Sequence, residues 1–180
     1  MIITRDDLKE YLDYEKALYN YTLIELITGD QKVYNWKFIR LLRKCEYYYN
    51  NRKSSAWHKF CYIWYRRRKN ILGVKIGVEI WENSFGKGLL IHHNGSIVVN
   101  RDARIGENCQ LHGDNCIGNS GRTEINDVPK LGSNVDIGVG AKIIGNVVIA
   151  NGIKVGANAV VTKSFSIENS TIIGIPAHLK

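Results

Sequence analysis

A six-residue repeat in the second half of the chain constrains its fold more than any other feature. Aliphatic residues recur every six positions from residue 99, pause after residue 117 and resume at residue 131. They are Val99, Ile105, Leu111 and Ile117, then Leu131, Ile137, Ile143, Ile149, Val155, Val161, Ile167 and Ile173. No helix has a period of six, and a simple strand has a period of two. The repeat therefore predicts a parallel β-helix, in which each hexad forms one side of a coil.

The residues around the repeat suit short strands joined by tight corners. Glycine often follows the aliphatic position directly, and asparagine stands near many corners, because both tolerate the left-handed backbone region. One coil buries little surface, so several coils must stack to close a core. Residues 121–128 interrupt the repeat. We expect them to form an inserted loop, since insertions in such repeats project from one face.

The chain before the repeat has helical patterns. We expect helices over residues 3–20 and 33–49, and a third helix after Ser55, where Trp57, Phe60, Cys61 and Trp64 follow helical spacing. Gly73 and Gly77 then mark the change to short strands. The predicted organisation is an N-terminal helical region over 1–72 and a β-helix domain over 73–180.

Positive charge is concentrated in residues 36–70. This segment carries eleven Lys and Arg residues against the single acid Glu46, whereas the whole chain has a net charge of +8. Aromatic residues alternate with the basic ones, a pattern typical of peripheral contact with a membrane or a polyanion; a helical cap with inward aromatic rings is the other interpretation. No nucleic-acid-binding motif accompanies the charge, so we do not expect nucleic acid as a partner.

Other features bear on location and redox state. The N-terminus lacks the apolar core of a signal peptide, and no apolar run approaches the ~18 residues that span a bilayer. We expect a cytoplasmic protein, with the inner face of the membrane as a further possibility raised by residues 36–70. Cys45, Cys61, Cys109 and Cys116 show no CxxC spacing, which favours free thiols.

Three stretches resemble the serine acetyltransferases. GKGLLIHHNGSIVVNRDARIGENCQL resembles their catalytic coil, IGVGAKIIGNVVIANGIKVGANAVV their acetyl-CoA coils, and IIGIPAHLK their closing segment. The resemblance covers roughly residues 74–180 and is strongest to short members that accompany polysaccharide synthesis. It implies a mainly β, left-handed parallel β-helix with three hexads per coil. It also implies acetyl-CoA as co-substrate, no metal, and a homotrimer with active sites between subunits.

The resemblance assigns roles to individual residues. His93 aligns with the catalytic histidine, the general base that takes a proton from the acceptor hydroxyl. Glu79 is predicted to orient His93, with Glu82 as the alternative. His92, Arg122 and Asp127 are predicted to contact the acceptor. The predicted acetyl-CoA contacts are Asn119, which also lies where an oxyanion would be held, Gly140, Ala141, Gly145, Ala159 and Lys163.

Two departures from the family pattern bear on the acceptor. His92 stands where serine acetyltransferases have an aspartate, and Val128 stands where they have a second histidine. We therefore expect the acceptor to be a hydroxyl of a lipid-linked or nucleotide-linked saccharide in surface polysaccharide synthesis. The alternatives are serine O-acetylation in cysteine biosynthesis and a non-catalytic scaffold. A zinc enzyme is not expected, because no histidine stands five positions from His112.

Overall fold

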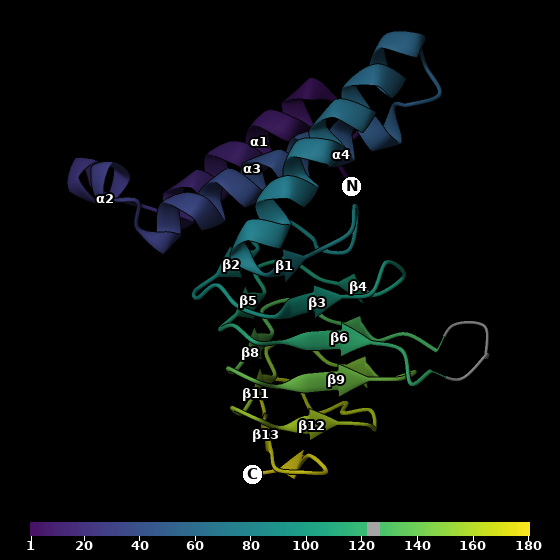
Figure 1. Cartoon of the computed structure of the whole chain (residues 1–180). Coiled ribbons are helices and arrows are strands. Elements are labelled where there is room, and N and C mark those ends of the chain that lie inside the picture. Colours follow the sequence, from purple (N-terminus) through teal and green to yellow (C-terminus); the bar gives the residue numbers. More distant parts are fainter. Residues whose placement is uncertain (122–126) are drawn as a thin grey trace.

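The computed structural model of the chain describes residues 1–121 and 127–180. Helices come first: α1 (Arg5–Leu18), α2 (Leu23–Thr28), α3 (Gln31–Asn50) and α4 (Ala56–Ile76). Short strands follow from Val78 onward. Figure 1 shows α1, α3 and α4 lying across one end of the stack of strands, with α2 extending to the side.

Side-chain caps fix where the helices begin. Thr4 and Thr22 each form a capping box with an acid three residues later, at the starts of α1 and α2. Ser55 caps α4, in agreement with the predicted start of the third helix. No sequence pattern predicts α2. The boundary predicted after residue 72 falls inside α4, which continues to Ile76; Gly73 is needed within it because a Cβ there would collide with the Val78 carbonyl.

The strands in the described residues form three sheets, here called A, B and C. Sheet A contains β1 (Val78–Glu79), β3 (Ile97–Val99), β6 (Cys116–Gly118), β9 (Lys142–Ile144) and β12 (Val160–Val161). Sheet B contains β4 (Arg104–Ile105), β7 (Lys130–Leu131) and β10 (Val148–Ile149). Sheet C contains β2 (Leu90–Ile91), β5 (Gln110–Leu111), β8 (Asp136–Ile137), β11 (Lys154–Val155), β13 (Thr171–Ile173) and β14 (His178–Leu179).

From β2 to β12, consecutive strands visit the three sheets in turn, so each of these coils has three sides. All pairs are parallel except the last, β13 with β14. Val99 pairs with Ile117 and Ile137 pairs with Val155, which are steps of eighteen residues, or three hexads. Leu111 pairs with Ile137, a step longer by the eight residues of the interruption. The strands before and after the interruption therefore continue the same stack, and residues 122–126 of the predicted loop lie outside the described residues.

The hexad positions supply the interior of the coils. Val99 to Val161 are all buried at these positions. The last two predicted positions are wrong: Ile167 is exposed, and Phe165 and Ile172 are buried instead of Ile167 and Ile173. Val155 pairs with Ile172, so this coil is one residue shorter than the others. A shift of one residue turns every side chain of a strand to the opposite face.

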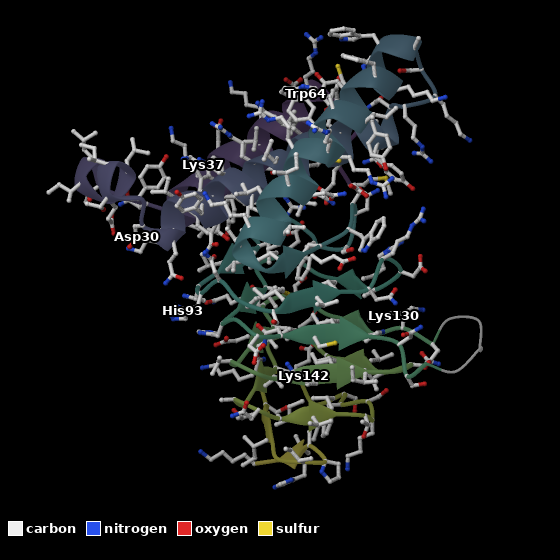
Figure 2. The ribbon with its side chains drawn as sticks, viewed as in Figure 1. Asp30, Lys37, Trp64, His93, Lys130 and Lys142 are labelled. Carbon is white, nitrogen blue, oxygen red and sulfur yellow. The ribbon has the colours of Figure 1, made fainter. Side chains whose placement is uncertain are left out.

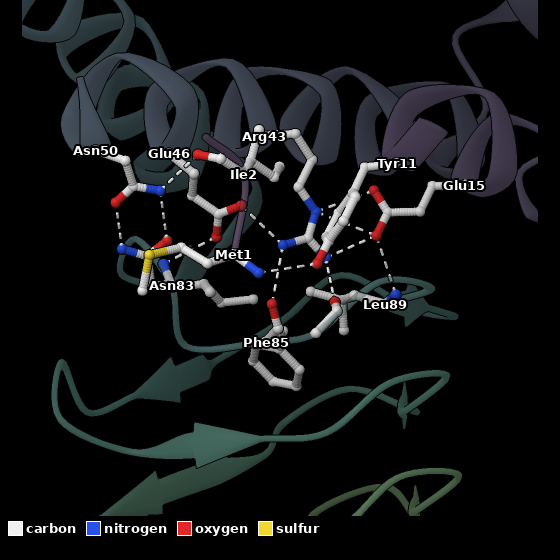
Figure 3. A network of polar contacts seen from close by, with 12 residues as sticks. Met1, Ile2, Tyr11, Glu15, Arg43, Glu46, Asn50, Asn83, Phe85 and Leu89 are labelled. Carbon is white, nitrogen blue, oxygen red and sulfur yellow. Dashed lines mark hydrogen bonds and ion pairs between the residues drawn. The ribbon is translucent and has the colours of Figure 1, made fainter. Parts of the chain in front are cut away.

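A buried charged network joins the helices to the first coil. Arg43 on α3 has no exposed surface and donates to the Glu15 carboxylate on α1, at 2.7 Å, and to Glu46, at 2.9 Å. It also donates to the carbonyls of Phe85 and Gly86, which precede β2. Figure 3 shows these groups converging between the helices and the strands. One side chain thus connects two helices with the coil region.

The basic and aromatic segment 36–70 divides between the two interpretations of its sequence. On α3, Trp36, Phe38 and Tyr47 are buried, as in a packed cap. On α4, the large apolar side chains are exposed, among them Trp57 and Phe60. None of the described helices is long and apolar enough to cross a membrane. All four cysteines are free thiols.

Candidate active site

His93 lies at the corner where the chain leaves sheet C for sheet A. It directly follows β2 and His92, and its side chain is exposed. Figure 2 shows it at the edge of the coil region, below the beginning of α3. A groove of about 420 Å³ runs from His93 along the coils past His112, Asp136 and Lys154. An imidazole at the mouth of a groove is accessible to a substrate held there.

The hydrogen-bond partner of His93 is not the predicted carboxylate. Gln31 on α3 places its side-chain nitrogen 3.0 Å from His93 Nδ1. Glu79 instead accepts a bond from the Trp81 indole and lines a separate cavity of about 410 Å³ between α4 and sheet A. The alternative, Glu82, is bonded to Lys69 and to the Cys45 thiol. The structure therefore brings neither acid to His93.

His92 takes part in a stacked pair on sheet C. Its ring lies 4.2 Å from the ring of His112, with 9° between their planes. His92 Nε2 lies 2.8 Å from the Gln110 side-chain oxygen, and His112 Nε2 lies 2.7 Å from Asp136. The stack follows from the register, since Ile91 pairs with Leu111 and the next residues are neighbours. One nitrogen of each ring is therefore already engaged within sheet C.

The predicted acetyl-CoA residues divide between the two ends of sheet A. Gly140, Ala141 and Ala159 lie at corners between sheets C and A, the same edge as His93. Asn119, Gly145 and Lys163 lie beyond the other ends of these strands, next to the inserted loop. Five residues of extended chain span about 16 Å. The two groups are therefore separated by about 16 Å along the strand direction of sheet A.

Several of these residues have structural reasons to be what they are. Ala141 and Ala159 are fully buried among the inner side chains. Gly140 has φ +73°, and a Cβ there would collide with the Asn158 side chain. Lys163 is exposed, with its ammonium 5.6 Å from the centre of the Phe165 ring. Their roles in acetyl-CoA binding stay predictions.

The predicted acceptor residues near the loop are placed in part. Asp127 is buried at the base of the loop, where its carboxylate accepts bonds from the backbone and hydroxyl of Ser120 and from the backbone of Asn146. These contacts close the loop onto β6 and β9. Arg122 lies outside the described residues, as does the rest of 122–126.

Three residues of this site were missed by the sequence reasoning. Gln31 stands after Asp30 at a helix start, 62 positions before His93, and nothing in the local pattern indicates their contact. His112 enters the sequence analysis only as a zinc ligand that is excluded. Asp136 and His112 precede and follow inward hexad positions, so their outward orientation was a signal that could have paired them. Within residues 1–121 and 127–180, no group of His, Cys, Asp and Glu could hold a metal ion.

Two curated proteins similar to this chain share one name, serine acetyltransferase. No family model matches the chain. A serine acetyltransferase of Staphylococcus xylosus is 32% identical over 131 residues, which are 68% of this chain and 60% of that protein. One from Staphylococcus aureus strain N315 is 30% identical over 104 residues, or 57% of this chain and 48% of that protein. The chain thus spans about half to three-fifths of the length of these curated relatives.

Solved structures agree in fold. The soybean serine acetyltransferase apoenzyme is 28% identical, with a TM-score of 0.64 over 81% of this chain and 58% of that chain. The Brucella abortus serine acetyltransferase in complex with coenzyme A has a TM-score of 0.75 over 97% of this chain and 68% of that chain, at 23% identity. At that identity the second likeness shows the fold alone.

These relatives correct the expected acceptor. The prediction of a saccharide hydroxyl in polysaccharide synthesis is wrong, because the relatives are named serine acetyltransferases. That prediction relied on only two departures from the family pattern, at His92 and Val128, and two positions are not enough to identify a different acceptor. The expected contact with the inner face of the membrane gains no support from them either. Sequence and fold together support the serine acetyltransferase-like hexapeptide-repeat acyltransferase family for this chain.

Proposed function

We propose that this chain is an acetyl-CoA-dependent serine O-acetyltransferase. The observation that carries the proposal is His93, exposed at the mouth of the groove on a chain whose relatives are serine acetyltransferases. In this reaction the serine hydroxyl attacks the thioester carbonyl. A carbon–oxygen bond forms, the carbon–sulfur bond breaks, and the hydroxyl proton passes through His93 to the departing thiolate. The left-handed sense of the coil belongs to the same proposal.

The groove offers charges that suit these substrates. Asp136 is the only carboxylate among the described residues that line it, and an amino-acid ammonium needs such a partner where His92 replaces an acid. Lys154 lines the same groove and can meet a phosphate of coenzyme A. The charges of Asp136 and Lys154 support a charged small-molecule acceptor rather than a neutral one.

A homotrimer belongs to the proposal. Its support is the resemblance to the serine acetyltransferases, which implies active sites between subunits, with the loop end of one subunit near His93 of another. Light scattering measures the assembly. A monomer that keeps full activity would contradict it.

The test of function is an assay of acetyl transfer to L-serine. The readout is the thiol of coenzyme A that each transfer releases. We expect turnover with a KM in the ordinary range of ~1 μM–1 mM. His93→Ala should lower kcat by at least ~10²-fold while calorimetry still shows coenzyme A binding, because only proton transfer is lost. His58→Gln, in the first turn of α4, is the matched control and should change neither value. Absence of thiol release by the unmodified protein would overturn the proposal.

A further inference from the structure

Gln31 links the helical region to the candidate base. It is the first residue of α3, and the preceding Asp30 caps the helix by accepting a bond from the Lys32 backbone. The Gln31 side chain lies between two groups of the corner after β2. Its nitrogen lies 3.0 Å from His93 Nδ1, and its oxygen accepts a bond from the Asn94 backbone at 3.3 Å. Figure 2 shows Asp30 and His93 facing each other across this junction.

The two contacts together determine which nitrogen of His93 carries the proton. An amide oxygen only accepts hydrogen bonds, and an amide nitrogen only donates them. The Asn94 backbone N–H therefore holds the oxygen on its own side, and the nitrogen must donate to His93 Nδ1. A neutral imidazole that accepts at Nδ1 carries its proton on Nε2. Nε2, the nitrogen not engaged by Gln31, then has no lone pair to accept a substrate proton.

We propose that Gln31 is the positioning residue of His93 and that it selects the tautomer of the ring. This inference rests on the proposed function. In the resting protein Gln31 holds the Nε2–H form. When the amide turns over, its oxygen accepts from Nδ1–H, Nε2 becomes free to act as base, and the Asn94 bond is lost. The loss of one net hydrogen bond lowers the reactive population roughly three- to tenfold.

No other described group competes for this role. The ionisable side chains that line the groove with His93 are His112, Asp136 and Lys154, and Asp136 is already bonded to His112. From the helical side, Asp30 caps α3 and Lys32 is paired with Glu25. Among residues 1–121 and 127–180, no carboxylate is bonded to His93. A neutral amide therefore takes the place that a carboxylate would hold beside a catalytic histidine.

Gln31→Glu separates this proposal from a merely structural role. A carboxylate accepts from both the Asn94 N–H and the His93 Nδ1–H, so it favours the tautomer with a free Nε2. Imidazole ¹⁵N chemical shifts in the full-length protein report the tautomer directly, with His93→Ala to assign the signals. We expect Nδ1 without a proton in the unmodified protein and with a proton in Gln31→Glu. A protonated Nδ1 in the neutral ring of the unmodified protein would overturn the inference.

Kinetics give a second readout. Gln31→Glu should raise kcat with L-serine about three- to tenfold near neutral pH, leave the KM for acetyl-CoA unchanged, and move the acidic limb of the pH profile to higher pH. Gln31→Met keeps the size of the side chain without its donor and acceptor, and should show no such gain. Equal losses of kcat in both variants would contradict the inference. If the unmodified protein transfers no acetyl group, the proposed function fails, while the ¹⁵N shifts still decide the role of Gln31.

Discussion

The helical region and the coil region are stabilised in different ways. In the coils, each inward aliphatic residue packs above and below an equivalent residue, and backbone bonds repeat from coil to coil. In the helical region, buried charges connect elements that are distant in sequence, as Arg43 does for α1, α3 and the first coil. A repeated interior spreads stability over many similar contacts, whereas the helical region concentrates it in a few unlike ones. Four substitutions test this difference.

Removal of Arg43 should have the largest effect. Arg43→Ala leaves the carboxylates of Glu15 and Glu46 buried without their partner, which typically costs about 3–5 kcal/mol. Urea unfolding measures the loss. Lys87→Ala is the control, because Lys87 and Glu10 form an exposed ion pair, and it should leave the unfolding midpoint unchanged. A loss of under ~1 kcal/mol for Arg43→Ala would show that the network does not hold the two regions together.

Truncation of an inward hexad residue should come next. Ile137 is fully buried, and Ile137→Ala should cost about 2–5 kcal/mol through lost contacts and the cavity left behind. Val148 on β10 points outward and is half exposed, so Val148→Ala should change stability by less than ~0.5 kcal/mol. Thermal unfolding of both variants gives the contrast. Similar losses would mean that the inward and outward faces are wrongly assigned.

A corner glycine should have an intermediate effect. Gly140 has φ +73°, and Gly140→Ala should cost about 1–3 kcal/mol through backbone strain and collision with Asn158. A Cβ at Gly118 in β6 would make only an ordinary contact with the Cys116 sulfur, at 3.8 Å, so Gly118→Ala is the matched control and should be tolerated. Denaturation of both variants without coenzyme A checks this. If Gly140→Ala unfolds like the unmodified protein, a role in ligand binding becomes the better explanation of that glycine.

The smallest effect is expected from protonation of Glu82, which pairs with Lys69 of α4. Burial alone would raise the pKa of Glu82. Lys69 and the Cys45 thiol outweigh this effect and hold the pKa of Glu82 below its usual range. The stability that Glu82 contributes is therefore fully present above the unfolded-state pKa of about 4.3 and is lost as the pH falls through the lower folded value.

Glu82→Gln tests this pH dependence. The free energy of unfolding of the variant should vary less with pH below about 5 than that of the unmodified protein. Tryptophan fluorescence can follow the unfolding, because all four tryptophans lie between residues 36 and 81. Glu79→Gln alters an exposed carboxylate three residues before Glu82 and should leave the slope unchanged. If the free energy of unfolding varies equally with pH in the unmodified protein and in both variants, Glu82 is not a source of acid sensitivity.

The candidate site combines a residue of the coil region, His93, with a partner from the helical region, and only the first could be predicted. His93 was identified because the stretch around it resembles the catalytic coil of the serine acetyltransferases, and the structure places it on a groove of the coils. Its partner could not be identified in the same way. The prediction of Glu79 assumed that the carboxylate comes from the preceding coil, but the actual contact comes from the N-terminus of α3. How that helix lies across the coils is determined by contacts between residues far apart in sequence.

The sequence by itself determined the periodic part of this protein. The hexads predicted the inward residues from Val99 to Val161, because each side of a coil obeys the same local rules of strand, corner and burial. The tertiary structure alone decided the short last coil, the buried partners of Arg43 and the contact of Gln31 with His93. These depend on packing between segments with no common period, and such contacts leave no regular pattern in the sequence.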